Sequence, residues 1–298
     1  MRVTPPLFVL AAPFCGASYV AGCLGMHPRL YAVPELCLLM ADDVGELLDI
    51  FRLSQGPQAD GLLRTIAQLE FGAQDDASIA AANDWLAQRS AWRTAQLLEE
   101  IAARVAPRRL VVPDTEAPLR PLDLRRLRRG YADAGVLHLT RHPWTQGCLL
   151  DAWAQDRLFV PPDYKDHGFI PALIEPQLPW LRCNRNIETA FAERARHLRV
   201  EDVETADDVT LAQLCEIAGV DADADALAAM REPERWIYAG YGPGAAPYGL
   251  EADVLETFSD EVLELAAAAS LDAALPWRPD GAGFDARLVE LARRYGYA

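Results

Sequence analysis

The sequence predicts an α/β protein with a central parallel sheet flanked by helices. Its 298 residues are 51% hydrophobic and 24% charged, which is ordinary usage for a globular protein. Short segments, most of them apolar throughout like buried parallel strands, recur along the chain. Segments with helical spacing separate them, and this alternation favours a parallel sheet covered on both faces. The expected strands are Pro6–Ala12, Tyr31–Val33, Arg109–Val112, Gly135–Leu139 and His197–Val200.

The first expected strand ends at Pro13, and a helix is expected over about 17–26, before His27-Pro28. A strand, a turn and a helix in this order can hold an anion at the helix N-terminus. Residues 41–106 have a mostly helical pattern. We interpret them as a helical insertion within one domain spanning 1–298.

The second half of the chain continues the alternation. Helices are expected over 121–130, 144–157, 179–195 and 211–218, and the alanine-rich tail is also expected to be helical. Residues 159–179 are rich in proline and aromatic residues, so we interpret them as a loop or lid. A second loop is expected at 240–249.

Charge and composition exclude several kinds of partner. The net charge is −16, and Lys165 is the only lysine, so no nucleic-acid partner is expected. The apolar runs are too short to span a bilayer, and the six cysteines lack zinc-site spacing, so neither membrane nor metal is expected. The first residues have no signal-peptide layout, which predicts a cytoplasmic protein. The sequence does not predict the oligomeric state.

Several motifs together resemble the sulfotransferase family. Residues 12–18 read Ala-Pro-Phe-Cys-Gly-Ala-Ser, and His27-Pro28 and Pro34-Glu35 follow. Sulfotransferases have Ala-Pro-Arg-Ser-Gly-Thr-Ser/Thr after an apolar strand, then a helix, His-Pro and Pro-Glu. The resemblance implies a P-loop-like, three-layer sulfotransferase fold.

Three later segments extend the resemblance over most of the chain. Residues 137–143 resemble the family's strand ending in Arg-His/Asp-Pro, and 198–203 resemble its Arg-Tyr-Glu-Asp-Leu segment. Residues 180–187 are similar to a Trp…Cys-His-x-Asn-Ile helix of bacterial sulfotransferases that act on polyketide chains. The resemblance therefore points to polyketide-associated members.

The resemblance also implies a cofactor site. In the family, the first loop cradles the phosphosulfate of PAPS (3′-phosphoadenosine 5′-phosphosulfate), and an arginine after a central strand binds its 3′-phosphate. The corresponding positions here are Phe14, Cys15, Gly16, Ala17, Ser18 and Arg141. Glu35 stands where many members have a catalytic base.

The sequence departs from the family at the residues that would bind PAPS. The loop Arg, Ser and Thr are replaced by Phe14, Cys15 and Ala17, and the family's Lys-Ser/Thr-Pro segment by Asp114-Thr115-Glu116. Losing three or four charge-assisted hydrogen bonds removes on the order of 5–10 kcal/mol of PAPS affinity. Arg120, Arg125, Arg141 and Arg185 are candidate replacement cations.

Three residues are candidate catalytic groups, and each has a structural alternative. Glu35 is interpreted as an acid–base residue with a raised pKa, or as a carboxylate in a solvated turn. Asp114, with Glu116, forms an acid–base pair or caps a helix. Arg141 clamps an anion, or pairs with a carboxylate such as Asp114.

Five residues are candidates for a substrate pocket, and one cysteine is a candidate nucleophile. Cys15 is either a small buried thiol or a thiolate whose pKa a helix N-terminus lowers. His142 and His27 have structural alternatives. The candidate pocket residues are Phe14, Glu116, His142, Trp144 and Asn184.

The favoured hypothesis is a divergent sulfotransferase-fold enzyme of bacterial small-molecule (secondary) metabolism. It would act without cofactor on a largely apolar substrate, free or carrier-bound, by acid–base chemistry such as cyclisation, elimination or rearrangement. One alternative is a true sulfotransferase that moves a sulfuryl group from PAPS to a hydroxyl. A second is a non-catalytic binding protein.

Overall fold

A parallel sheet forms the centre of the computed structural model, which describes residues 4–54, 57–155, 157, 160–192, 194–247, 264 and 267–298. The order across this sheet is β2-β3-β1-β4-β7, and all neighbours run parallel. β1 thus lies in the middle, as its fully buried side chains require. The strand bounds are Leu7–Ala11 for β1, Leu30–Ala32 for β2, Arg109–Asp114 for β3, Gly135–Thr140 for β4 and Ala195–Arg199 for β7.

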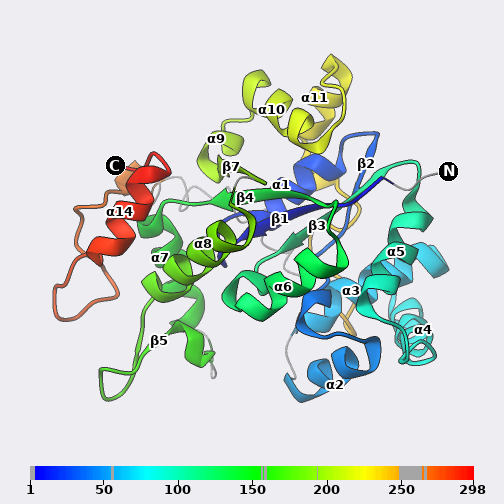
Figure 1. Ribbon diagram of the computed structural model, residues 1–298, viewed down its shortest axis with the longest axis horizontal. Helices are drawn as coiled ribbons and strands as arrows, with labels where there is room; N and C mark the ends of the chain where they lie inside the picture. The colour runs from blue at the N-terminus through cyan, green and yellow to red at the C-terminus, as the bar shows by residue number, and fades with distance from the viewer. Residues whose placement is uncertain are drawn as a thin grey trace.

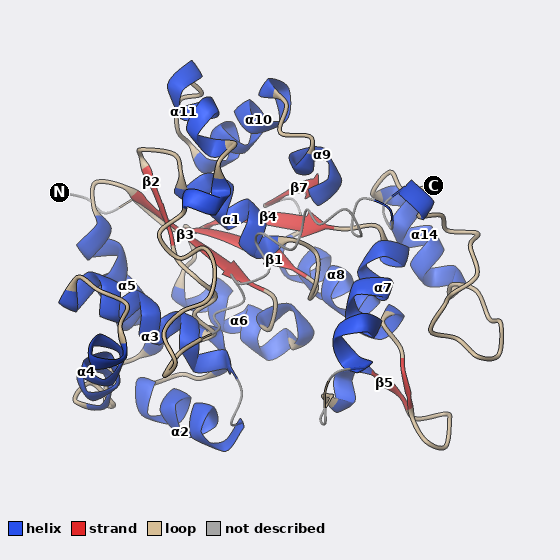
Figure 2. Ribbon diagram, turned by 180° about the vertical axis from the view of Figure 1, so that it is seen from behind, coloured by secondary structure: helices blue, strands red, loops and turns tan. Residues whose placement is uncertain are grey.

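Helices cover both faces of the sheet, so the expected α/β class is confirmed. α6 (Pro121–Gly130) and α8 (Gln177–Phe191) lie over the face seen in Figure 1. α1 (Ala17–Gly25) lies over the opposite face, seen in Figure 2. α10 (Asp208–Ala218) and α11 (Ala224–Met230) lie on the side of α1. The result is a three-layer arrangement.

The segment 41–106 is largely helical, and it gathers beside the β2 edge of the sheet (Figure 1). Its apolar side chains face inward, as in α5, where Leu97, Leu98 and Ile101 are buried. Its helices are α2 (Val44–Ser54), α3 (Asp60–Ile66), α4 (Asp76–Ala87) and α5 (Thr94–Val105), with short turns η1 (Leu38–Met40), η2 (Pro57–Ala59) and η3 (Ala67–Phe71).

Several expected helix boundaries differ from the structure, and both ends of the helix expected over 179–195 do so. α8 begins at Gln177 rather than Pro179, because a proline in the first turn has no helical N–H to lose. It ends at Phe191 rather than Ala195, because Ala195 pairs with Val136 in the sheet. α7 spans Pro143–Gln155.

The tail was also expected to be helical, and among its described residues only part is. α14 covers Ala286–Arg294, whereas residues 269–285 form turns and irregular structure rich in Gly, Pro and Asp. Residues 240–247 form the expected loop. The expectations for residues 248–263 lie outside the described residues, as does residue 159 of the expected lid.

The lid segment contains a small hairpin that is fixed to the C-terminal part of the chain. β5 (Lys165–Asp166) pairs antiparallel with β6 (Leu173–Ile174), after the turn η5 (Pro162–Tyr164). The buried carboxylate of Glu175 accepts hydrogen bonds from Trp277 Nε1 (3.1 Å) and Arg278 Nη1 (2.8 Å). The Trp277 ring lies where a side chain at Gly147 would stand, so α7 must carry glycine there.

Within the described residues, none of the helices has both the length and the apolar character needed to cross a membrane.

Candidate active site

The candidate residues lie where neighbouring parallel strands end. The loop 12–16 follows β1, Glu35 lies three residues after β2, Asp114 ends β3 and Arg141 follows β4. In an open α/β sheet this carboxyl edge is where ligands bind. β1 separates β3 from β4, so the acids after β2 and β3 lie on one side of the loop and Arg141 on the other.

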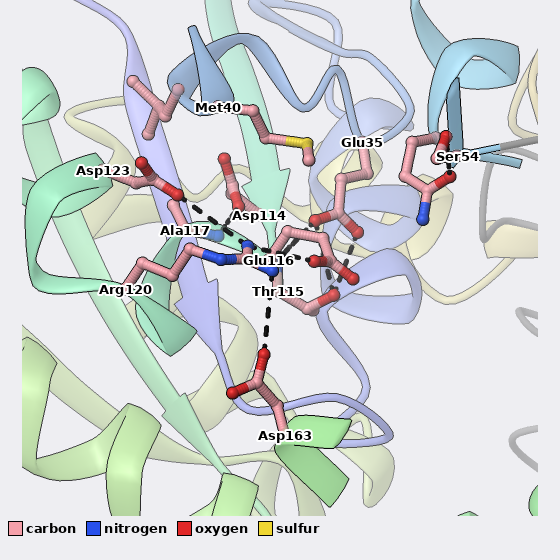
Figure 3. Close-up of polar contacts among 12 residues, drawn as sticks. Glu35, Met40, Ser54, Asp114, Thr115, Glu116, Ala117, Arg120, Asp123 and Asp163 are labelled. Carbon is pink, nitrogen blue, oxygen red and sulfur yellow. Dashed lines mark hydrogen bonds and ion pairs between the residues drawn. The ribbon is translucent and has the colours of Figure 1, made fainter. Parts of the chain in front are cut away.

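Glu35 is buried, with 3% of its surface exposed, so the alternative of a solvated turn is wrong. Its Oε1 accepts hydrogen bonds from the backbone N–H groups of Thr115 (2.6 Å) and Glu116 (3.0 Å), and its Oε2 from the Thr115 hydroxyl (3.0 Å) (Figure 3). Gly61 of α3 packs so closely on the Glu35 carbonyl that any side chain there would collide with it. Packing and hydrogen bonds therefore fix this carboxyl group.

The acids near Glu35 hold protons more tightly than usual. Burial raises the pKa of Glu35 well above its ordinary value, and the charges of Asp114 and Glu116 raise it further. Burial likewise raises the pKa of Asp114 to about 7. Burial also raises the pKa of Glu116, and the charge of Arg120 offsets part of this rise. Such shifts arise where acid–base groups are needed at neutral pH.

Asp114 also has the structural role that the sequence left open. Its Oδ1 accepts a hydrogen bond from the Ala117 N–H (2.7 Å), so it caps the short turn η4 (Ala117–Leu119). The cap occupies one carboxylate oxygen. Asp114 therefore caps a turn and lies beside Glu35.

Arg120 is surrounded by acids (Figure 3). Its guanidinium lies 3.6 Å from Glu116, 3.9 Å from Asp123 and 3.8 Å from Asp163. Asp163 also pairs with Arg182. Arg120 is thus engaged with carboxylates at this edge.

Two of the other candidate cations lie on α6 and α8, the helices that cover one face of the sheet. Arg125 is exposed on α6. Arg185 is exposed on α8 and lines a groove of about 320 Å³ with residues of α14. Of the four candidates, Arg141 is the one that packs on the loop 12–16.

The loop after β1 adopts a tight conformation with two left-handed residues. Phe14 has φ 64° and Gly16 has φ 78°. The Phe14 ring packs on Trp153 at 5.7 Å between centroids. A Cβ at Gly16 would lie 2.5 Å from Val200 Cγ2 and 3.2 Å from Arg141 Nη2. Close packing and backbone conformation thus both require glycine at position 16.

Cys15 is fully buried, and burial raises the pKa of its thiol to about 12. Arg141 and the backbone hydrogen bonds lower the pKa, but the loss of water outweighs them. Burial and the raised pKa therefore favour the small buried thiol over the alternative of a thiolate nucleophile.

Arg141 has 1% of its surface exposed and pairs with an acid that the sequence did not suggest. Its Nη2 donates a hydrogen bond to Glu204 Oε1 over 2.6 Å. Glu204 ends α9 (Val200–Glu204), the helix that follows β7. The suggested partner, Asp114, lies two strands away. Arg141 Nε and Nη1 are buried without a hydrogen-bond partner among the described residues.

His142 and Trp144 contact the C-terminal part of the chain. The His142 N–H donates to Glu201 (2.7 Å), and its ring packs on Tyr297 at 5.2 Å. Burial lowers the pKa of His142. The Trp144 indole N–H donates to the Ala274 carbonyl over 3.2 Å.

Asn184 is a core residue in this structure. Its Oδ1 lies 2.7 Å from His138 Nε2, and its Nδ2 donates to the Trp180 carbonyl over 2.8 Å. Both ends of the amide are bonded inside the core between α8 and the sheet. The interpretation of Asn184 as a pocket residue is not retained. His27 has the structural role expected as its alternative, since its buried Nε2 bonds the Asp221 carbonyl over 3.0 Å.

Two neighbours of the candidate residues were missed from the sequence: Thr115 bonds Glu35, and Glu204 pairs with Arg141. The buried Tyr164, one of the aromatic residues of the expected lid, has its pKa raised by burial and by the charges of Glu116, Cys183 and Glu35. Thr115 lies between the candidate acids Asp114 and Glu116 in the sequence, and this position could have identified it as a neighbour of the site. Nothing in the sequence separates Glu204 from its acidic neighbours.

The described residues contain no group of three or more His, Cys, Asp or Glu side chains arranged to hold a metal ion. Neither a protein-family model nor a curated protein matches the chain by sequence.

Two solved structures are similar to the chain over its whole length. One is the sulfotransferase domain of the olefin synthase of Synechococcus PCC 7002, at TM-score 0.73 and 22% identity, covering 100% of this chain and 96% of that one. The other is the sulfotransferase domain of the curacin biosynthetic pathway, at TM-score 0.72 and 20% identity, covering 100% and 99%. The chain therefore has the sulfotransferase fold, as the resemblance predicts.

Proposed function

We propose that the chain is an enzyme of bacterial small-molecule (secondary) metabolism that performs acid–base chemistry without PAPS. The observation that carries the proposal is the buried Glu35 carboxyl, held by Thr115 and Glu116 beside Asp114. The two similar structures come from an olefin synthase and a biosynthetic pathway, which supports this setting. We also propose a cytoplasmic location.

The residues of the first loop do not fit PAPS. Its phosphosulfate and 3′-phosphate need several donors or cations, whereas Phe14 and Ala17 supply no side-chain donor and Cys15 is buried. Glu204 neutralises the charge of Arg141. Asp114 and Glu116 stand where the family has a cation, and their carboxylates would repel the added negative charge.

Paired acids with raised pKa values suit reactions that add and remove protons. Burial raises the pKa of Glu35 well above its ordinary value, which favours the protonated form and suits this group to donate a proton. Asp114, with a pKa of about 7, is close to half ionised and can accept a proton. A cyclisation, elimination or rearrangement needs one group of each kind.

The surroundings favour an apolar substrate. Phe14 and Met40 are half-buried at this edge of the sheet, and Tyr164 is buried near Glu116. We assign the acid–base roles to Glu35 and Asp114. We do not assign one to Arg141, because its guanidinium is buried and already paired with Glu204.

The test combines a cofactor titration with a matched pair of variants. Calorimetric titration with adenosine 3′,5′-bisphosphate at low salt should show no binding at millimolar nucleotide. Apolar ketones, alcohols and thioesters, incubated in D₂O and analysed by mass spectrometry, should yield deuterated or rearranged products. Glu35→Gln should abolish them, whereas the exposed control Glu290→Gln should not. Unchanged turnover in Glu35→Gln would overturn the assignment.

A PAPS-dependent sulfotransferase is the second candidate, and one observation favours it. Two buried nitrogens of Arg141, Nε and Nη1, have no hydrogen-bond partner among the described residues, and they lie beside a loop that leads into the N-terminus of α1. Micromolar binding of the bisphosphate, weakening as salt rises, would support this candidate over the first.

A further inference from the structure

We propose that Glu204 is a built-in counter-ion that takes the place of a ligand's anionic group at Arg141, so that this site rejects negatively charged ligands. The carboxylate of Glu204 lies 2.6 Å from Arg141 Nη2, and the two side chains are 8% and 1% exposed. Glu204 is thus a specificity-determining residue. Its role is separate from the chemistry assigned to Glu35.

Burial makes this pairing obligatory. Arginine cannot lose its proton in a protein, so a buried guanidinium must have an anion beside it. In an anion-binding site, the ligand supplies that charge. Here the chain supplies it from α9, and no net positive charge is left to attract an anion.

The same helix also closes the space beside the loop. Val200, the first residue of α9, and the Arg141 guanidinium both lie close to the position that a Cβ at Gly16 would take. Glu201 uses one oxygen on the His142 N–H and the other on the Tyr297 hydroxyl. Arg141 Nη2 bonds Glu204 rather than this neighbouring acid.

The first experiment removes the carboxylate and supplies an anion from solution. Glu204→Ala leaves Arg141 without its counter-ion and opens a space that matches the lost acetate-sized group. The melting temperature of this variant should fall. Acetate and inorganic phosphate should then raise it, whereas chloride at equal ionic strength should not. The melting temperature of the wild type should be the same in acetate, phosphate and chloride at equal ionic strength.

The second experiment measures ligand binding directly and guards against misfolding. Glu204→Gln keeps the shape and one hydrogen bond but removes the charge. It should bind adenosine 3′,5′-bisphosphate at least about tenfold more tightly than the wild type. Removing both partners with Arg141→Met/Glu204→Leu should abolish the response to anions, since neither buried charge remains.

A surface pair serves as the control. Arg196 and Glu216 lie 3.5 Å apart, and both are more than half exposed. Glu216→Ala should change neither the melting temperature nor its response to phosphate.

Two results would overturn the proposal. One is that both Glu204 variants respond to phosphate and nucleotide no more than the wild type does. The other is that the wild type binds the bisphosphate as tightly as Glu204→Gln. Neither result bears on turnover by Glu35, which is measured separately.

Discussion

Thr115 and Glu35 join the ends of two neighbouring strands. The Thr115 N–H donates to Glu35 Oε1 over 2.6 Å, and its hydroxyl lies 3.0 Å from Oε2. β2 and β3 are adjacent in the sheet, so the position of the Glu35 carboxyl follows from strand register. These hydrogen bonds hold the Glu35 carboxyl group in one position while it gains or loses a proton.

Replacing Thr115 by valine tests this link. The variant keeps the backbone N–H bond and loses the hydroxyl, so we expect it to lose about 1 kcal/mol of stability in urea denaturation. If Glu35 acts as the acid, the pH profile of turnover should also move upward, because losing a donor disfavours the carboxylate. An unshifted profile with reduced stability would leave Thr115 a purely structural role.

Asp114 predicts a pH dependence of stability. Its pKa is about 7 in the folded chain and ordinary when unfolded, so the folded chain binds this proton more tightly. The contribution is fully present below about pH 4 and is lost as pH rises through 7. The wild type should lose on the order of a few kcal/mol of stability in this way. Asp114→Asn has no carboxyl group to ionise, so this variant should be more stable than the wild type at pH 8. Urea denaturation at pH 5 and pH 8 measures the difference.

Two histidines, the buried His138 and the half-buried His197, predict the opposite trend. Burial lowers the pKa values of His138 and His197 to about 4 each. Both must remain neutral in the fold, so their contribution is present above about pH 6.5 and is lost as pH falls toward 4. His197→Gln should show a smaller loss of stability between pH 6 and pH 4.5. An equally steep loss would assign the acid sensitivity to other groups.

Gly16 can be compared with a glycine of similar conformation. Gly16→Ala places a Cβ 2.5 Å from Val200 Cγ2, whereas Gly72, with φ 76°, has no neighbour within 4 Å of its Cβ position. Gly72→Ala should lose about 1 kcal/mol, which is the cost of the left-handed backbone. Gly16→Ala should lose clearly more, because it adds a collision. Equal losses in thermal denaturation would show that the loop relaxes freely.

The thiols should differ in reactivity. Cys15 is fully buried with a pKa of about 12, whereas Cys148 is half-buried with a pKa of about 11. Iodoacetamide labelling of the native chain, followed by peptide mass spectrometry, should modify Cys148 well before Cys15. Rapid labelling of Cys15 would show that the loop opens in solution.

The sheet could be predicted because its strands are short, most of them are apolar, and Pro, Gly or polar residues bound them. β7, which contains two arginines and a histidine, is the exception, and its predicted start at His197 was two residues late. The predicted strand at Arg109–Val112 differs from β3 by two residues at its end. The end of α8 was missed because Ala192 to Ala195 have good helical propensity, and pairing with β4 overrides it. Long-range pairing of this kind leaves no local signal.

The sequence predicted which residues form the candidate site better than it predicted the contacts between them. Glu35, Asp114 and Glu116 come together because parallel strands end at one edge. The partner of Arg141 depends on strand order, since β7 lies beside β4 while β3 lies beyond β1. Glu204 follows β7 and therefore reaches Arg141, whereas Asp114 does not.

The hairpin fixed by Glu175 and Arg278 carries Lys165, the single lysine of the chain. Amine-reactive dyes therefore have one side-chain target. A fluorophore there would follow the hairpin in a native sequence, with no cysteine to engineer and none of the six thiols to remove. Quenching by Trp277 would report whether the hairpin separates from its anchor during a reaction cycle.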